Sequence, residues 1–360
     1  MFGDIYQNRK VFVTGHTGFK GSWLHLWLGR LGASVTGYSL GPPSEPSHHV
    51  VLGLSPDHSP ADVRDFPQLA GVLSAAGPEI VFHLAAQPIV RRSYADPLET
   101  FSTNVLGTAN VLEACRRAPS VRACVVVTSD KCYENKDWVW GYRETDPVGG
   151  HDPYSASKGC AELVTASFRR SFFEAPDGES GAQVLVASAR AGNVIGGGDW
   201  GEDRLTPDVM RAAAAGRPVG LRHPESVRPW QHVLDVLAGY LLLGQRLLEG
   251  RREFGDPWNF SPGAEACRNV RSVVETYKRY WDKIEYRTVT EDNPPRESAW
   301  LLLDSSKARH RLGWAPLWEG ETGFARTVEW YRRFCEENRP VSRDQLEEYF
   351  GDAVKKGAAW

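Results

Sequence analysis

The sequence lacks the features that mark nucleic-acid-binding and membrane proteins. No run of lysine and arginine stands out, and the formal net charge of −3 argues against nucleic acid or an anionic membrane as a partner. No apolar run approaches the length of a membrane span, and the N-terminal stretch MFGDIYQNRK has no apolar signal core. We therefore expect a soluble cytoplasmic protein.

Cysteine is scarce, and its six residues form no CxxC pair and no regular spacing. Three of them, Cys115, Cys124 and Cys160, fall within strand or helix patterns, so we expect unpaired thiols in a reducing compartment and no metal site. Internal repeats and low-complexity tracts are also missing. The 360 residues, 41% of them hydrophobic, are enough for one large domain or two unequal ones.

The first half of the chain alternates short apolar runs with amphipathic segments. Longer helical patterns cover 101–117 and 154–173, and a shorter one follows the first apolar run. Strands alternating with helices predict an α/β protein with a doubly wound parallel sheet of the Rossmann type. The runs that predict buried strands are 10–15, 33–40, 79–86, 123–129 and 183–190.

The composition changes after residue 190. A glycine-rich, charged segment is followed by a predicted helix over 208–215, a strongly apolar helix that starts near residue 232, and polar helical segments. We expect a larger domain over 1–190, with 233–262 returning to its sheet. Segments 191–232 and 263–360 are expected to form a smaller C-terminal lobe that binds the substrate.

A glycine-rich turn lies between the first predicted strand and the first predicted helix. Its spacing is G-x-x-G-x-x-G, and glycines let the backbone turn tightly and approach a pyrophosphate at the helix N-terminus. Because the turn joins the first strand to the first helix, it predicts a dinucleotide site rather than an ordinary tight turn. The expected contacts are Gly15, His16, Thr17, Gly18, Phe19, Lys20 and Gly21.

The end of the second predicted strand does not decide between NAD and NADP. An acidic residue usually binds the adenosine ribose at this place, but the strand ends Gly37-Tyr38-Ser39-Leu40, without an arginine for a 2′-phosphate either. Asp62, in the string ADVRD, is either an acceptor for the adenine amino group or a solvated loop acid. The sequence leaves both interpretations open.

A tyrosine and a lysine four residues apart, Tyr154 and Lys158, share one face of a predicted helix. A phenol with a pKa of about 10 is a poor base at neutral pH, and a lysine cation one turn away lowers that pKa. The pair then deprotonates an alcohol while a nicotinamide takes its hydride. Any long helix can contain Tyr-x-x-x-Lys, but the glycine loop and Ser129, at the end of an upstream strand, make the pattern specific.

The residues that carry a resemblance to the extended short-chain dehydrogenase/reductase family are Gly15, Gly18, Gly21, Ser129, Tyr154 and Lys158. The strings TSDKCYEN, GGHDPYSASKG and RAGNVIGGGDW are similar to a branch of that family that acts on sugar nucleotides, over nearly the whole chain. The resemblance implies NAD as a recycled cofactor, CDP-glucose as the small-molecule substrate, and a role in making deoxysugars such as those of lipopolysaccharide. The larger domain is then the NAD-binding domain, and the smaller lobe binds the nucleotide sugar.

The resemblance also implies contacts beyond the glycine loop. Asn193, Arg204 and Arg228 stand in strings similar to nucleotide-sugar contacts, and Arg296 stands where a histidine is expected. Gln87 is expected near the sugar. The implied cofactor contacts are Val63, Leu84, Ala85, Ala86, Thr128, Tyr154 and Lys158.

The implied reaction removes water between C5 and C6 of the sugar while C4 becomes a ketone. A base must take the C5 proton, and an acid must protonate the C6 hydroxide as it leaves. Related dehydratases carry an Asp–Glu pair after this strand, whereas this chain has Asp130–Lys131. We expect Asp130 as the acid and Lys131 as the base, both neutral in a closed site. The alternative is an ordinary ion pair at a strand end.

Two other classes of function remain. A dehydratase or epimerase that acts on dTDP-glucose or UDP-glucose shares most of these motifs, although an epimerase needs no acid–base pair beside Ser129. A non-catalytic dinucleotide-sensing module shares the fold, although it has no need of Tyr154 and Lys158. We also expect a homodimer or a dimer of dimers, because helices 101–117 and 154–173 carry apolar residues on more than one face.

Overall fold

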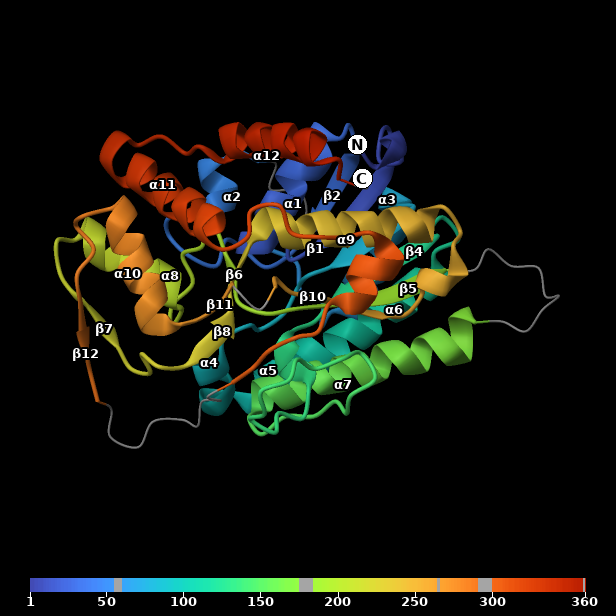
Figure 1. The fold of residues 1–360 in the computed structure, drawn as a ribbon. Coiled ribbons are helices and arrows are strands. Elements are labelled where there is room, and N and C mark those ends of the chain that lie inside the picture. Colours follow the sequence, from blue (N-terminus) through green and yellow to red (C-terminus); the bar gives the residue numbers. More distant parts are fainter. Residues whose placement is uncertain (55–59, 175–183, 264–265, 291–299, 359) are drawn as a thin grey trace.

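A six-stranded parallel sheet forms the centre of the molecule (Figure 1). The computed structural model describes residues 1–54, 60–174, 184–263, 266–290, 300–358 and 360. The strand order is β10-β5-β4-β3-β1-β2. The strands are β1 (Lys10–Thr14), β2 (Ser34–Tyr38), β3 (Ile80–His83), β4 (Ala123–Val127), β5 (Leu185–Ala191) and β10 (Pro257–Phe260).

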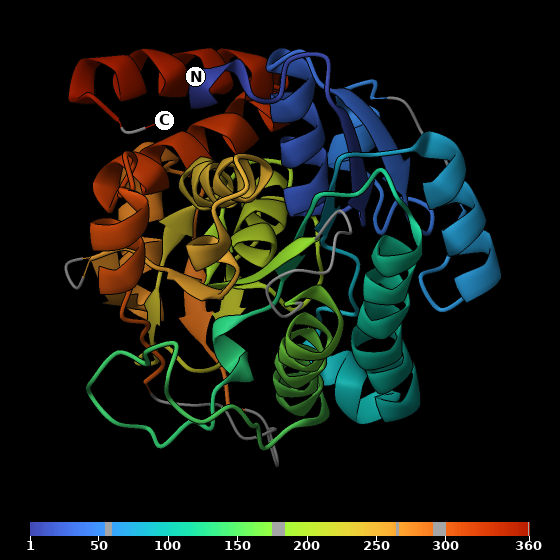
Figure 2. The same cartoon turned by 90° about the vertical axis from the view of Figure 1, so that its right-hand side faces the viewer.

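Both faces of this sheet are covered by helices, as the apolar strands require. Along β1, Val11 and Val13 pack into the core on one face while Phe12 packs into the core on the other. The first face is covered by α1 (Phe19–Arg30) and α9 (Val233–Leu248). The second face is covered by α3 (Phe66–Ala76), α6 (Gly107–Arg117) and α7 (Pro153–Phe168), and α6 lies beside α7 (Figure 2).

Short elements connect the helices on the second face and carry the chain past the sheet edge. Pro153 and Asp152 start α7, because proline fits the first helical position and the Asp152 carboxylate accepts from the Ser155 amide.

The short elements are η1 (Phe2–Asp4), α2 (His48–Val51), α4 (Val90–Ala95), α5 (Pro97–Phe101), η2 (Ser102–Leu106), η3 (Asp130–Cys132), η4 (Arg169–Phe173) and η5 (Arg252–Phe254).

The remaining elements gather at the carboxyl edge of the sheet and over α9 (Figure 1). Three two-stranded sheets lie here, pairing β11 with β8, β12 with β7, and β6 with β9. None of the helices in the described ranges is long and apolar enough to cross a membrane. The elements are β6 (Val194–Ile195), α8 (Leu205–Ala214), β7 (Val219–Leu221), β8 (Val227–Pro229), β9 (Gln231–His232), β11 (Cys267–Asn269), α10 (Val270–Tyr280), β12 (Tyr286–Thr288), η7 (Ala308–Leu312), α11 (Glu321–Glu337) and α12 (Ser342–Lys356).

The predicted doubly wound fold is confirmed, and all five predicted strands are present. The chain runs from β1 outward to β2 and then returns to place β3 on the other side of β1. The direction in which successive strands are added to the sheet therefore reverses between β1 and β3. In doubly wound proteins a crevice forms where this reversal occurs, at the carboxyl ends of the two strands. The glycine loop follows β1, and the segment that starts at Leu84 follows β3, so both lie at this crevice.

Candidate active site

The glycine loop packs backbone against backbone, which only glycine allows. Gly15 has a φ of +72°, and a Cβ atom on it would lie 2.7 Å from the Ala85 nitrogen. A Cβ atom on Gly21 would lie 2.1 Å from the Gly15 oxygen. The loop leads into α1, whose first amides have no partner within the helix. This bare turn at a helix N-terminus fits the pyrophosphate of a dinucleotide.

We expect Gly21→Ala to abolish NAD binding, because its Cβ atom overlaps the Gly15 carbonyl and must push the loop out of shape. Gly29→Ala is the matched control on the same helix, since a Cβ atom there meets nothing within 4 Å. This control should bind NAD normally and gain stability of about 0.5–1 kcal/mol. Calorimetric titration of NAD into both variants is the measurement, and normal binding by a folded Gly21→Ala protein would contradict the assignment.

His16 and Thr17 fasten the loop to the end of β2 rather than pointing outward. The Ser39 hydroxyl lies 3.0 Å from both the Thr17 hydroxyl and His16 Nδ1. The His16 ring fills the space beside Gly37, where a Cβ atom would lie 2.4 Å from the ring. The strand therefore ends in small and hydroxyl residues because it must accommodate His16, which explains why no acidic residue was found there.

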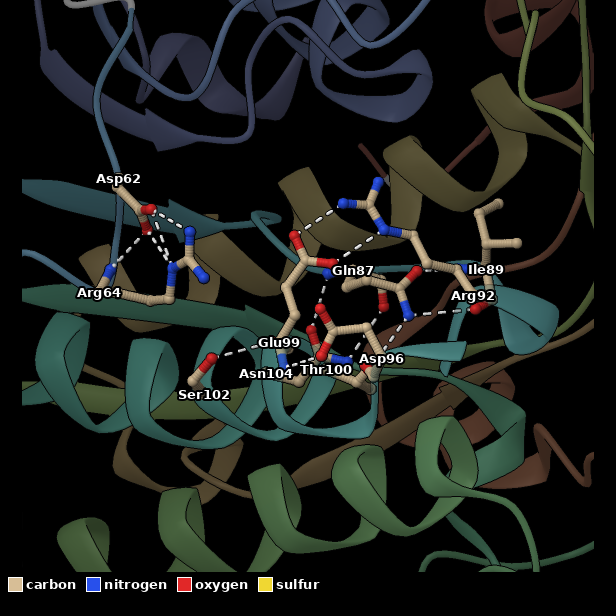
Figure 3. A network of polar contacts seen from close by, with 10 residues as sticks. All are labelled: Asp62, Arg64, Gln87, Ile89, Arg92, Asp96, Glu99, Thr100, Ser102 and Asn104. Carbon is tan, nitrogen blue, oxygen red and sulfur yellow. Dashed lines mark hydrogen bonds and ion pairs between the residues drawn. The ribbon is translucent and has the colours of Figure 1, made fainter. Parts of the chain in front are cut away.

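Asp62 and Val63 lie after β2, where the adenine end of a dinucleotide was predicted to bind. Both carboxylate oxygens of Asp62 accept from the Arg64 guanidinium, at 2.6–3.0 Å (Figure 3). The Tyr38 hydroxyl donates to the Asp62 carbonyl at 2.9 Å. Val63 is buried. Adenine binding by Asp62 stays a prediction, and it requires the carboxylate to share or leave Arg64.

Gln87 was expected near the sugar, but its side chain faces the protein interior. Its amide nitrogen donates to the Thr100 hydroxyl at 2.9 Å and to the Ile89 carbonyl at 3.1 Å, and its oxygen accepts from the Ile89 amide (Figure 3). The physical reason is that Gln87 shapes the loop after β3 together with Asn104, which accepts from its backbone amide. Residues Pro88, Ile89, Val90 and Arg91 of this loop line the pocket instead.

Leu84 and Ala85 begin the same loop and are held by β1. The Thr14 hydroxyl oxygen accepts from both of their amides at 3.2 Å. Ala85 also faces Gly15 closely enough that a Cβ atom on that glycine would overlap it. The predicted contacts Leu84, Ala85 and Ala86 are thus next to the glycine loop in space, although they lie far from it in the sequence.

The segment that follows β4 brings Ser129, Asp130 and Lys131 into a single tight turn. The Ser129 hydroxyl donates to Asp130 Oδ1 at 2.9 Å and accepts from the Lys131 amide at 3.2 Å. The other carboxylate oxygen, Oδ2, is buried without a hydrogen-bond partner among the described residues. Burial raises the pKa of Asp130, although Lys131, Ser129 and Arg228 oppose that rise.

Lys131 is half-buried and forms no ion pair with Asp130 in the part of the chain that the structure describes. An ordinary ion pair at a strand end was the alternative prediction for these two residues. The geometry instead leaves a buried carboxyl oxygen without a partner beside an amine that faces the same pocket.

Tyr154 and Lys158 lie one turn apart on α7 and are both buried. Burial raises the pKa of the Tyr154 phenol to about 12, and a hydrogen bond with Ser129 opposes the rise. Burial lowers the pKa of Lys158 to about 8, with Glu162 opposing the fall. The Lys158 ammonium donates to the Val127 carbonyl at 3.5 Å. Thr128, a predicted cofactor contact, lines the pocket but directs its hydroxyl to Glu162.

One pocket collects these side chains and the predicted substrate contacts. It runs from the turn after β4 past β6 and α8 to β7, so the sheet supplies one end and the smaller elements supply the other. Arg296 lies outside the described residues. The predicted site residues among those that line the pocket are Phe19, Lys20, Thr128, Ser129, Asp130, Lys131, Tyr154, Asn193, Arg204 and Arg228.

The pocket contains cations that the sequence did not reveal. Arg91 lies 3.8 Å from Asp203, and Arg222 donates to the same carboxylate at 3.1 Å. Arg204, which the sequence did predict, is held by Asp199 at 3.0 Å. Arg91 and Arg222 were hard to identify because they come from α4 and from the end of β7, and single arginines on separate segments carry no sequence signal.

Lys20 extends from the glycine loop into the catalytic end of this pocket. Burial, together with the Lys158 and Arg204 cations, lowers its pKa to about 7, although Asp130 and Asp199 oppose the fall. Its Nζ atom lies 5.9 Å from the centre of the Tyr240 ring. The sequence predicted a cofactor contact here, and the structure adds that the same side chain borders the catalytic residues.

Comparison with known proteins agrees with this geometry. Residues 11–254 match the model of the NAD dependent epimerase/dehydratase family. The chain is 46% identical over 356 residues to a CDP-glucose 4,6-dehydratase of Salmonella typhimurium, covering 98% of this chain and 99% of that protein. It also superposes on a dTDP-glucose 4,6-dehydratase from Streptomyces venezuelae with NAD and TYD bound, with 25% identity, a TM-score of 0.74, and coverage of 90% and 97%.

A UDP-glucose 4-epimerase from Thermotoga maritima shares the fold, with a TM-score of 0.74 over 90% of this chain and 99% of that one, at 24% identity. The chain belongs to the NAD dependent epimerase/dehydratase family.

Proposed function

We propose that the protein is a hydro-lyase that uses NAD to convert CDP-glucose to CDP-4-dehydro-6-deoxyglucose. The observation that carries the proposal is the turn of Ser129, Asp130 and Lys131 in one pocket with Tyr154, whose neighbour one turn along α7 is the buried Lys158. The extensive identity to a CDP-glucose 4,6-dehydratase supports the nucleotide. A simple oxidoreductase or epimerase has no use for a buried carboxyl group and an amine next to the tyrosine.

The residues present fit NAD, because the glycine loop leaves the start of α1 accessible and Ala85 and Ala86 continue the same crevice. When bound, NAD accepts a hydride from C4 of the sugar and returns it to C6. Gly15, Gly18 and Gly21 let the backbone approach the pyrophosphate. Lys158 keeps a positive charge beside Tyr154 as the alcohol is oxidised.

Three side chains move protons in this reaction. Tyr154 takes the O4 proton, and it needs the charge of Lys158 because burial holds its pKa at about 12. The ketone at C4 then acidifies the C5 proton, which Lys131 removes and gives back to C5 when the hydride returns to C6. Asp130 protonates the C6 hydroxyl as it leaves as water. Burial raises the pKa of the Asp130 carboxyl group and so favours the protonated form that this role requires.

The pocket also holds groups that are suited to the nucleotide diphosphate. The Arg228 charge acts on Asp130 and the Arg204 charge acts on Tyr154, so both arginines lie near the catalytic end. Asn193 lines the same region. A sugar that places its C4 hydroxyl at Tyr154 would therefore place its diphosphate between these arginines, and guanidinium groups bind phosphate oxygens well.

The proposal is tested by incubating the protein with NAD and each of CDP-, dTDP- and UDP-glucose. We expect CDP-glucose to lose water, seen as a mass decrease, with no net NADH at the end because the hydride is returned. Faster turnover of dTDP- or UDP-glucose under equal conditions would contradict the CDP assignment. Epimerisation without water loss would contradict the dehydratase assignment.

We also propose that the protein forms a homodimer, or a dimer of dimers, through α5, α6 and α7. Two of these helices, α5 and α7, carry large apolar side chains that are exposed to solvent, Leu98 at 80% exposure and Leu163 at 60%. Leu163→Glu should therefore produce monomers at micromolar concentration in sedimentation. Val354→Glu on α12, at a position 77% exposed, is the control and should leave the dimer intact. A monomeric unmutated protein would refute the proposal.

The product supports a role in deoxysugar biosynthesis, because a 4-keto-6-deoxy sugar nucleotide is activated for further change at C3 to C5. Its use in lipopolysaccharide and a cytoplasmic location stay predictions.

A further inference from the structure

A buried carboxylate lies directly behind the catalytic lysine. Glu162 follows Lys158 by one turn of α7, so Tyr154, Lys158 and Glu162 form a line along one face of the helix. Glu162 and its partner Arg190 on β5 each have a side chain only 4% exposed, and their nitrogen and oxygen lie 2.7 Å apart. The reaction proposed above uses neither residue.

The carboxylate is held in one position from three sides. The Ser188 hydroxyl and Arg190 Nη2 each donate to Glu162 Oε2 at 2.7 Å, and the Thr128 hydroxyl donates to Oε1 at 2.5 Å. Burial raises its pKa, but Arg190 and these hydroxyl groups outweigh burial and hold the pKa below its ordinary value. Glu162 is therefore a fixed negative charge rather than a titrating group.

Arg190 is fixed in turn by residues beyond the pocket. Its Nη1 donates to the Tyr133 hydroxyl at 2.7 Å, and that hydroxyl donates to Asn259 Oδ1 at 2.7 Å. A pair buried so deeply is costly to build unless its groups are satisfied, and here its carboxylate is fully satisfied. On the pocket side, α7 places the charged side chain of Lys158 next to this pair.

Other groups that face Lys158 either add positive charge or are neutral. Lys20, from α1, is a second amine, and it is close enough for the Lys158 charge to lower its pKa. His83, from β3, has its pKa lowered to about 3 by burial and by Lys158, so it is neutral at working pH. Burial raises the pKa of the Cys132 thiol, which is therefore neutral as well. Asp130 lies across the pocket, and Tyr154 precedes Lys158 on α7.

We infer that Glu162 is the positioning residue that keeps Lys158 in its ammonium form and so allows Tyr154 to act as a base. Within the described part of the chain, the Lys158 side chain has one hydrogen bond, a long one of 3.5 Å to the Val127 carbonyl, so hydrogen bonding alone does little to hold its charge. Without the carboxylate, burial favours the neutral amine, because burial is the largest influence on the Lys158 pKa and Glu162 is the first charge that opposes it. The predicted change in the rate of hydride transfer rests on the proposed function. The predicted change in the Lys158 pKa does not.

Glu162→Gln is the direct test, measured in two ways. Competitive labelling of Lys158 with acetic anhydride across pH, read by mass spectrometry, should show the lysine losing its proton at a lower pH than about 8. The pH profile of single-turnover hydride transfer should shift its rising limb to higher pH. At pH 7 this step should slow about tenfold for each unit by which the phenol pKa rises, with little change in KM.

Three further variants keep the test decisive. Glu162→Asp retains the charge and should restore most of the rate and the pH profile. Glu162→Gln/Arg190→Met removes both charges, serves if the single variant does not fold, and should shift the profile in the same direction by less. Glu337→Gln, which breaks an exposed pair with Arg333 on α11, should change nothing.

The inference would be overturned if a folded Glu162→Gln variant, or the folded double variant, kept both the Lys158 pKa and the pH profile of the unmutated protein. Glu162 would then be a structural residue. The labelling result does not depend on turnover. Absence of water loss by the unmutated protein would therefore contradict the proposed function, while the labelling would still support or overturn the effect of Glu162 on Lys158.

Discussion

Lys131→Met is expected to yield an enzyme that oxidises CDP-glucose but does not dehydrate it. Tyr154 and Lys158 lie on α7 and are untouched, so the hydride still leaves C4 and NADH forms on the enzyme. The C5 proton then loses its assigned base, because Lys131 is the amine in the turn with Asp130. The 4-keto hexose and enzyme-bound NADH should accumulate, which absorbance spectroscopy detects, and the C5 proton should not exchange with deuterated solvent.

Two controls separate this outcome from general damage. Lys136→Met makes the same change five residues later, at a side chain that is 52% exposed and pairs with Glu134, and it should behave as the unmutated protein. Tyr154→Phe should abolish even the transient NADH signal, because the O4 proton has no acceptor. Normal C5 exchange in a well-folded Lys131→Met protein would contradict the assignment of Lys131 as the C5 base. The base would then be another group in the pocket.

Much of this architecture was predictable because it depends on local patterns. Apolar runs of four or five residues such as ACVVV can only be buried strands when helical patterns flank them, and β4 is indeed buried throughout. The glycine loop was recognisable for a similar reason, since Gly15 and Gly21 permit contacts that no other residue permits. These requirements act over short stretches of chain, and a sequence records them directly.

The parts that the sequence did not reveal depend on distant segments meeting. Gln87 resembles a sugar contact in its string, but Thr100 and Asn104, on the helical segments further along the chain, draw it into the interior. Arg91 and Arg222 converge on Asp203 from widely separated elements, and neither stands in a recognisable motif. Glu162 is different, because its spacing of four from Lys158 was visible, but nothing in the sequence placed Arg190 behind it.

No acidic residue ends β2, and the reason is a contact with the glycine loop, which precedes β2 in the sequence. His16 occupies the space beside Gly37, and Ser39 is engaged with both His16 and Thr17. A carboxylate at this strand end would compete with those contacts. Adenine binding by Asp62 stays a prediction, and the sequence could not show that the Arg64 guanidinium is bonded to that carboxylate.

Asp130→Asn is expected to separate proton removal from water loss. Asparagine keeps the shape of the side chain but has no proton for the leaving C6 hydroxide, so dehydration should slow by about 10²–10⁴-fold. Lys131 remains, so the C5 proton should still exchange with deuterated solvent while the 4-keto hexose persists. This order of effects is the reverse of that expected for Lys131→Met, in which exchange itself is lost.

The pH dependence provides an independent check on the same residue. Asp130 works as the protonated acid, and burial raises its pKa, so its proton is retained to a higher pH than in an ordinary aspartate and is lost as the pH rises through that raised value. The rate of water loss in the unmutated protein should fall on the alkaline side for this reason, and Asp130→Asn should lose that dependence. Asp137→Asn is the control, because Asp137 is exposed and its φ of +52° suits asparagine equally well. If Asp130→Asn dehydrated CDP-glucose at the normal rate, the acid would have to be a water molecule or another residue, and burial of the Asp130 carboxyl group would need a structural explanation.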